Sequence, residues 1–219
     1  MALYKMTKDL RGSFDATPYL DAGIHENCKL DRVEYGKSDK GNEFVAFYFK
    51  NPSGSQVSKT EWPVRLPEPL TKLSPEAYAA DTSSEKNMYE SMIANQMARI
   101  KHICVDSGFV SEDSFTFEVN TFEEFAKAII SLLGESYKDK LVRIKVIYDR
   151  NNFTSLPSYT RYVWIEPMTV SIEESKMRIL SIDKMERIHA DNEANTPNPF
   201  ANSSTNANTS GTSKEDLPF

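Results

Sequence analysis

The order of β-favouring and helical segments constrains the fold of this chain most strongly. Three segments rich in β-branched and aromatic residues, at about 23–35, 43–50 and 55–62, come before a helical region. Two more, at about 140–149 and 159–170, come after it. The OB-fold, a five-stranded Greek-key barrel with a helix between strands three and four, has this order. The sequence therefore predicts a mainly β protein with a helical insertion, and an α+β sandwich is the main competing fold.

The helical insertion, at about 70–135, contains two recognisable helices. Residues 84–106 carry apolar side chains at steps of three and four, and Gly108 follows them. A second helix is predicted to begin at Thr121, because Glu124 completes a capping box, and to end at Gly134. Two further expectations concern the β segments and the end of the domain. The broken alternation in 23–35 predicts a β-bulge, and residues 172–188 are expected to form a short helix.

Composition divides the chain into three parts. Residues 1–20 are interpreted as an arm, 21–189 as the OB-fold domain, and 190–219 as a disordered tail rich in Asn, Ser, Thr and Ala. The tail ends in two acidic residues and an apolar tip, which suit a partner protein with a basic pocket and an apolar notch. The predicted partner-binding residues are Glu215, Asp216, Leu217, Pro218 and Phe219.

The net charge of −6 argues against a protein that holds nucleic acid by bulk positive charge, but a local basic groove is compatible with it. Two cysteines are too few for a disulfide framework and suit a reducing compartment. We find no signal peptide and no apolar stretch of membrane-spanning length. The sequence therefore predicts a soluble, cytoplasmic protein.

Aromatic and basic side chains recur on the predicted non-core faces of several strands. In 43–50, Val45, Phe47 and Phe49 are assigned to the core, which leaves the alternate positions outside. Flat rings that stack on bases, together with cations that follow phosphates, are what single-stranded nucleic acid requires. The predicted DNA-binding residues are Phe44, Tyr48, Lys50, Lys59, Trp62, Arg143, Lys145, Arg161, Tyr162 and Trp164.

The chain also resembles a known family. Segments 23–27, 33–35, 41–44, 47–49 and 60–62 look like the N-terminal strands of single-stranded-DNA-binding proteins (SSBs) of tailed bacteriophages. The Leu-Pro-Phe ending is similar to the acidic tip of bacterial SSBs, although it carries fewer acids. The resemblance implies an OB-fold that coats single-stranded DNA during replication, recombination and repair in the host cytoplasm. It also implies a tail that recruits other enzymes of these processes.

Other functions remain open at this stage. An adaptor protein that uses its β-domain and its tail to hold other proteins is the alternative, and RNA is an alternative ligand. The pairs His25 with Cys28 and His102 with Cys104 match zinc in ligand type, but their spacing is poor. No phosphate-binding glycine loop or nucleophile elbow is present, so we expect neither enzymatic activity nor a cofactor.

Overall fold

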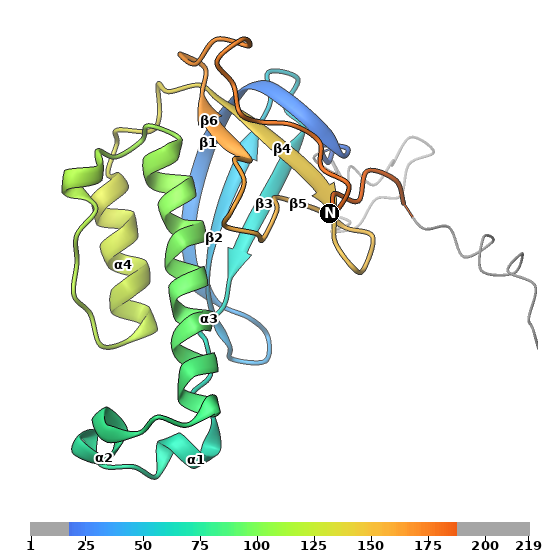
Figure 1. The fold of residues 1–219 in the computed structure, drawn as a ribbon. Coiled ribbons are helices and arrows are strands. Elements are labelled where there is room, and N and C mark those ends of the chain that lie inside the picture. Colours follow the sequence, from blue (N-terminus) through green and yellow to red (C-terminus); the bar gives the residue numbers. More distant parts are fainter. Residues whose placement is uncertain (1–17, 188–219) are drawn as a thin grey trace, which may run out of the picture. The chain divides into compact units, whose positions relative to one another are not determined.

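The computed structural model describes residues 18–187, and the predicted tail and most of the predicted arm lie outside this range. The chain divides into two units, residues 1–186 and 187–219, and the fold described below belongs to the first. Within residues 18–187, six strands form one antiparallel sheet that curls into a nearly closed barrel (Figure 1). The strands are β1 (Gly23–Lys37), β2 (Glu43–Lys50), β3 (Gln56–Glu61), β4 (Val142–Tyr148), β5 (Thr154–Ser155) and β6 (Ile165–Pro167).

The long strand β1 belongs to both halves of the barrel. Its first residues pair with β4, and from Lys29 onward it pairs with β2. The register shifts between His25 and Cys28, where Asn27 has a φ of 56°. A second shift lies between Leu30 and Arg32. The predicted bulge is therefore confirmed, and it lets one strand bend enough to serve two neighbours.

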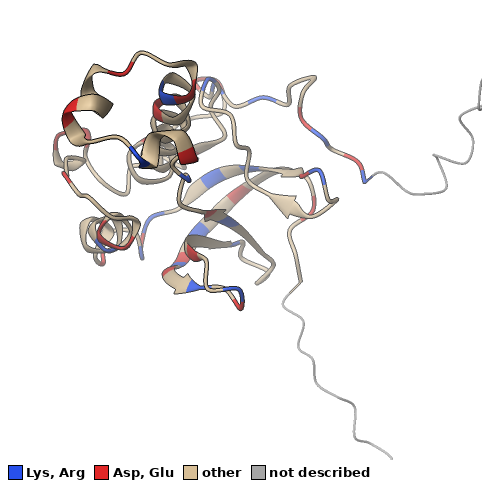
Figure 2. Ribbon diagram, turned by 90° about the horizontal axis from the view of Figure 1, so that it is seen from below, with Lys and Arg blue, Asp and Glu red and all other residues tan. Residues whose placement is uncertain are grey.

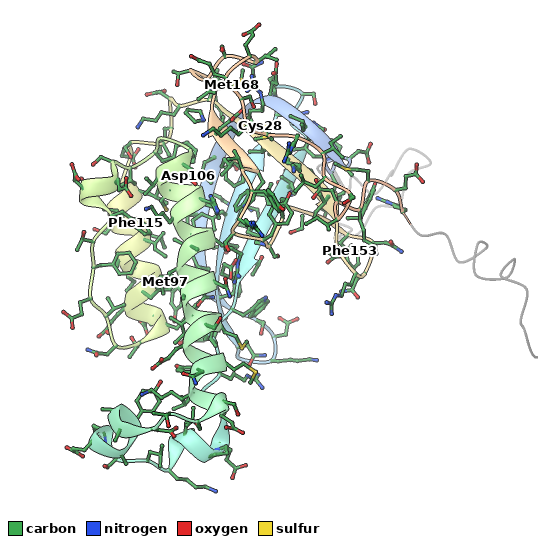
Figure 3. The ribbon with its side chains drawn as sticks, in the orientation of Figure 1. Cys28, Met97, Asp106, Phe115, Phe153 and Met168 are labelled. Atoms are coloured by element: carbon green, nitrogen blue, oxygen red, sulfur yellow. The ribbon has the colours of Figure 1, made fainter. Side chains whose placement is uncertain are left out.

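Helices fill the region between β3 and β4. They are α1 (Glu68–Thr71), α2 (Pro75–Ala80), α3 (Ser84–Lys101) and α4 (Phe122–Leu133), with a π-helical turn at His102–Asp106 and a 3₁₀ turn at Glu112–Ser114. Helix α3 runs across the face of the sheet with α4 beside it, and Met97 lies between these two helices (Figures 1 and 3). Within the described residues, no helix is both long and apolar enough to cross a bilayer.

Helix α4 follows its sequence prediction at both ends. Thr121 accepts a hydrogen bond from the backbone of Glu124, whose carboxylate accepts one in return, and Gly134 is the C-cap. Helix α3 ends earlier than predicted, because the chain widens into the π-helical turn after Lys101. The core packs these helices against the barrel interior, and Val45, Phe47 and Phe49 lie in it as predicted.

Two predictions about the end of the domain are wrong. Only Ile165–Pro167 of the predicted strand 159–170 is a β-strand of the sheet. The residues before it turn instead, since the Trp164 indole donates to the Tyr159 carbonyl at 3.0 Å. The described part of the predicted helix 172–188, residues 172–187, contains no helix, and residues 171–186 form a covering segment of turns and extended backbone. Ile172, Ile179 and Ile182 are exposed, so the apolar positions there do not form a buried helical face.

Lys59 closes the barrel between its two edges. Its side chain points inward from β3, in register with the buried Phe47. The Lys59 ammonium donates to the Leu156 carbonyl at 3.2 Å and to the Ser158 hydroxyl at 2.6 Å. Leu156 and Ser158 follow β5, the strand at the opposite edge of the sheet. One side chain thus joins β3 to the β5–β6 connection, and burial lowers the pKa of Lys59 to about 8.

This buried ammonium makes a testable contribution to stability. Between the folded pKa of about 8 and the ordinary value of 10.5, the unfolded chain binds more protons at Lys59 than the folded chain does. The free energy of unfolding should therefore rise with pH in this window relative to Lys59→Met, by up to about 3 kcal/mol. Urea denaturation of both proteins from pH 7 to 10.5 measures the difference. Parallel pH curves for the two proteins would contradict it.

Candidate nucleic-acid interface

A groove of ≈ 850 Å³ lies where the end of β3, helix α3 and the β5–β6 connection meet. Residues 61–65 form one side, and residues 158–161 contribute another. Met92, Asn95, Gln96 and Arg99 of α3 line it as well. The Lys59 bonds described above keep the β5–β6 connection next to β3, so barrel closure and the shape of the groove have the same cause.

Trp62 is the exposed aromatic ring of this groove. It follows the last residue of β3, and Pro63 removes the backbone donor that would continue the strand. The ring is 47 % exposed and lies 5.4 Å from the Phe44 ring, centroid to centroid. Gly36 packs under Phe44, where a Cβ would come within 2.9 Å of the ring. Phe44 therefore packs against one part of the Trp62 side chain, and much of the remaining surface is open to a planar ligand.

Three arginines line the groove, and one of them is neutralised. Arg99 makes two hydrogen bonds of 2.7 Å to Glu61, the one acidic residue in the lining described. Arg65 donates to the Asn42 side chain at 3.3 Å, and Arg161 is exposed. Neither makes an ion pair within residues 18–187. Basic and acidic residues are otherwise interspersed along the strands (Figure 2), so this excess of positive charge is local.

A pair of tyrosines continues the aromatic surface on the β5–β6 connection. Tyr159 lines the groove, and its ring meets that of Tyr162 edge-on at 5.7 Å. Tyr162 is 36 % exposed. Burial, followed by a hydrogen bond to Asp183, raises the pKa of Tyr159 far above its ordinary value. Tyr159 therefore stays a neutral donor, fixed at its hydroxyl, and orients the more exposed Tyr162.

The ten predicted DNA-binding residues separate into three groups. Trp62 and Arg161 line the groove, with Phe44 against Trp62 and Tyr162 next to Arg161. Tyr48 and Lys50 lie on the outside of β2, but Arg32 covers the Tyr48 ring at 3.7 Å and Asp31 pairs with Lys50 at 3.0 Å.

The remaining four residues are buried, so the expectation that they project into solvent is wrong. Lys59 points inward because it is in phase with the buried Val57 and Glu61 of β3, whereas Trp62, which follows the strand, has the opposite phase. Arg143 and Lys145 do point away from the barrel core, but the covering segment lies over them. Trp164 is 0 % exposed, with its indole against His102 and its N–H bonded to Tyr159.

The two buried cations of β4 hold the covering segment in place. Lys145 donates to the Asp183 carboxylate at 2.9 Å and to the Arg178 carbonyl at 2.5 Å. Arg143 pairs with Glu26 and Glu166, and Glu166 also accepts a hydrogen bond from Ser175 at 2.6 Å. Both side chains are buried in these contacts, so their role in the described structure is positional.

His102 joins the helical insertion to the wall of the groove. Its Nδ1 is bonded to Asp106, and its Nε2 lies 3.0 Å from the carbonyl oxygen of Thr160, a lining residue. Burial acts to lower the pKa of His102, but the bonds to Asp106 and Thr160 outweigh it, and the pKa is raised. Both partners are acceptors, so only the doubly protonated imidazolium satisfies both. His102 is the first residue of the π-helical turn, and from there its side chain reaches the β5–β6 connection at Thr160.

The His102 contact predicts a pH-dependent stability. Because the folded pKa is raised, the stabilisation is complete below the ordinary value of 6.5 and is lost as the pH rises through the folded pKa. The difference in free energy of unfolding between the wild type and His102→Gln should therefore shrink from about pH 6.5 upward. Chemical denaturation across pH 5.5–8.5 measures it, and Asp106→Asn should weaken the same trend. A difference that is constant with pH would refute this role.

The cysteine and histidine pairs do not assemble into a metal site in the described part of the chain. Within residues 18–187, no group of three or more His, Cys, Asp or Glu side chains is placed to hold an ion. Cys28 and Cys104 are buried, and burial raises the pKa of each thiol to about 12. The thiolate form that zinc requires is therefore disfavoured at both positions.

Sequence reasoning missed several lining residues of the groove. Arg65 and Asn95 carry no pattern that distinguishes them from ordinary solvated residues, and only the meeting of β3 with α3 brings them together. Tyr159 lies in the predicted strand 159–170 and is not among the predicted DNA-binding residues. Comparison with known proteins adds no family assignment, because no protein-family model and no curated protein matches the chain.

Proposed function

We propose that this protein binds single-stranded DNA without sequence preference, as a non-catalytic component of DNA replication, recombination or repair. The observation that carries the proposal is the groove in which the half-exposed Trp62 lies with Arg65 and Arg161, two arginines without ion pairs in the described chain. An open ring next to unpaired guanidinium groups suits bases and phosphates of an unpaired strand. Stacking on a ring accepts any base, so binding of this kind needs no sequence preference.

The distribution of charge favours a single strand over a duplex. Duplex binders that use the phosphate backbone spread many cations over a wide surface. This chain has a net charge of −6, and its outer β1–β2 surface is neutralised by Asp31 at Lys50. A positive excess confined to one groove with aromatic rings fits a flexible strand whose bases are free to stack.

The topology supports an OB-fold as the scaffold of this function. A nearly closed barrel contains a β1 strand that pairs with both β2 and β4, and helices fill the connection from β3 to β4. This arrangement is typical of the five-stranded OB barrel, whose faces bind oligonucleotides in many proteins. The similarity of segments 23–27 and 60–62 to phage SSBs supports the same interpretation.

The second part of the proposal concerns the end of the chain. We propose that Glu215, Asp216, Leu217, Pro218 and Phe219 recruit partner proteins of the same process. These residues lie outside the described range, and the proposal depends on the sequence of the tip alone.

Tryptophan fluorescence tests DNA binding, because the two tryptophans differ completely in exposure. Oligo-dT should quench the wild-type emission through Trp62, which is 47 % exposed, whereas Trp164 is 0 % exposed. Trp62→Phe should abolish the quenching, and Trp164→Phe should keep it. Trp62→Ala should also weaken oligo-dT binding about 5- to 150-fold, since stacking contributes about 1–3 kcal/mol per base.

The outcome separates DNA binding from the adaptor function. An adaptor that binds only protein would show no change in emission on addition of oligo-dT at low salt. Quenching that persists in Trp62→Phe would place the strand elsewhere and contradict the proposed groove.

A further inference from the structure

A second cavity of ≈ 470 Å³ adjoins the groove, and the two share Arg161. The β5–β6 connection forms part of its wall through Arg161 and Tyr162, and the covering segment contributes Lys176 and Arg178. No acidic side chain of the described residues lines it. The cavity therefore combines three cations with one aromatic ring, from two segments far apart in the sequence.

These three cations have no competing ion pair within residues 18–187. Arg161, Lys176 and Arg178 are exposed, and none of them takes part in an ion pair among the described side chains. Exposed lysines elsewhere, such as Lys72, Lys127 and Lys138, pair with a carboxylate three or four residues away. Cations that gather without a local counter-ion create a positive potential that attracts an anionic ligand.

The covering segment presents these cations in a fixed orientation. Met177 is buried between two exposed neighbours, so Lys176 and Arg178 project to the same side. The Arg178 carbonyl accepts a hydrogen bond from the buried Lys145, and the Ser175 hydroxyl binds Glu166. Anchors on both sides of Lys176 therefore hold the basic pair close to Arg161.

We infer that Arg161, Lys176 and Arg178 form a phosphate-contacting extension of the groove, which holds the sugar-phosphate chain of the same DNA strand beyond Trp62. This inference rests on the proposed function. The shared Arg161 connects the groove, which Arg65 also lines, to the cavity lined by Lys176 and Arg178. The Tyr159–Tyr162 pair spans the same boundary and offers Tyr162 as a second ring for a base.

The dependence of oligo-dT affinity on salt tests the extension. Each phosphate contact on a single strand contributes about −0.7 to the slope of log K against log salt concentration. The double variant Lys176→Gln/Arg178→Gln should reduce the magnitude of this slope by about 1.4 with a long oligo-dT. With an oligonucleotide just long enough to quench Trp62, the variant and the wild type should have similar affinity.

The matched control removes two positive charges elsewhere. Lys127→Gln/Lys138→Gln changes the net charge equally, and both side chains are exposed, on or after α4, and line neither the groove nor the second cavity. The control should leave the slope unchanged. Circular dichroism checks that both double variants keep the wild-type fold.

The possible outcomes separate this inference from the function on which it rests. If the wild type does not bind oligo-dT, the proposed function fails. If the wild type binds and Trp62 is quenched, but the Lys176/Arg178 variant keeps the wild-type slope on long oligonucleotides, the extension is refuted. An equal loss of slope in the control would also refute it, because bulk charge alone would then explain the effect.

Discussion

The proposed groove depends on an ammonium group buried inside the barrel. Lys59 reaches from β3 to the Leu156 carbonyl and the Ser158 hydroxyl, and so joins the two edges of the sheet where backbone pairing is incomplete. Burial of this charge is unfavourable, as the lowered pKa of about 8 indicates. In return, the β5–β6 connection is held beside β3 and α3. The groove with Trp62 on one side and residues 158–161 on another follows from that contact.

Several cationic side chains with little exposure hold segments that have no regular secondary structure. Lys145 projects from the outer face of β4 and binds a carboxylate and a carbonyl of the covering segment. Arg143 pairs with Glu166 of β6, and Glu166 accepts a hydrogen bond from Ser175 of the same segment. His102 does the same for Thr160 from the π-helical turn after α3. Each of these contacts fixes a stretch that has few ladder hydrogen bonds of its own. The exposed cations of the proposed interface, Arg161 and Arg178, lie on stretches held in this way.

Local signals in the sequence were sufficient for β2 and α4, but insufficient for the end of the domain and for the site. The capping box at Thr121 and Gly134 predicted both ends of α4, and the alternation of Val45, Phe47 and Phe49 predicted the inner face of β2. The alternation of side chains along a strand also places Lys59 and Trp62 on opposite sides, so the sequence alone argues against both being site residues.

The outward phase of Arg143 and Lys145 was predicted correctly, but their burial depends on the segment 171–186, whose path no periodicity indicates. The burial of Trp164 also depends on tertiary structure, because a turn between residues 159 and 164 replaces the first part of the predicted strand. The prediction is consistent with the structure for Trp62 and Arg161, which both line the groove. Trp62 directly follows β3, and Arg161 lies in the connection between β5 and β6. Arg65, Lys176 and Arg178 come together only through the fold.

Mapping of ultraviolet cross-links between oligo-dT and the intact protein tests the central claim most directly. Mass spectrometry should place the cross-linked thymidines on peptides that contain Trp62 and residues 159–162, the two aromatic sides of the groove. Cross-links confined to the outer β2 surface around Tyr48, or the absence of any cross-link under conditions that join the oligonucleotide to a known single-strand binder, would contradict the account.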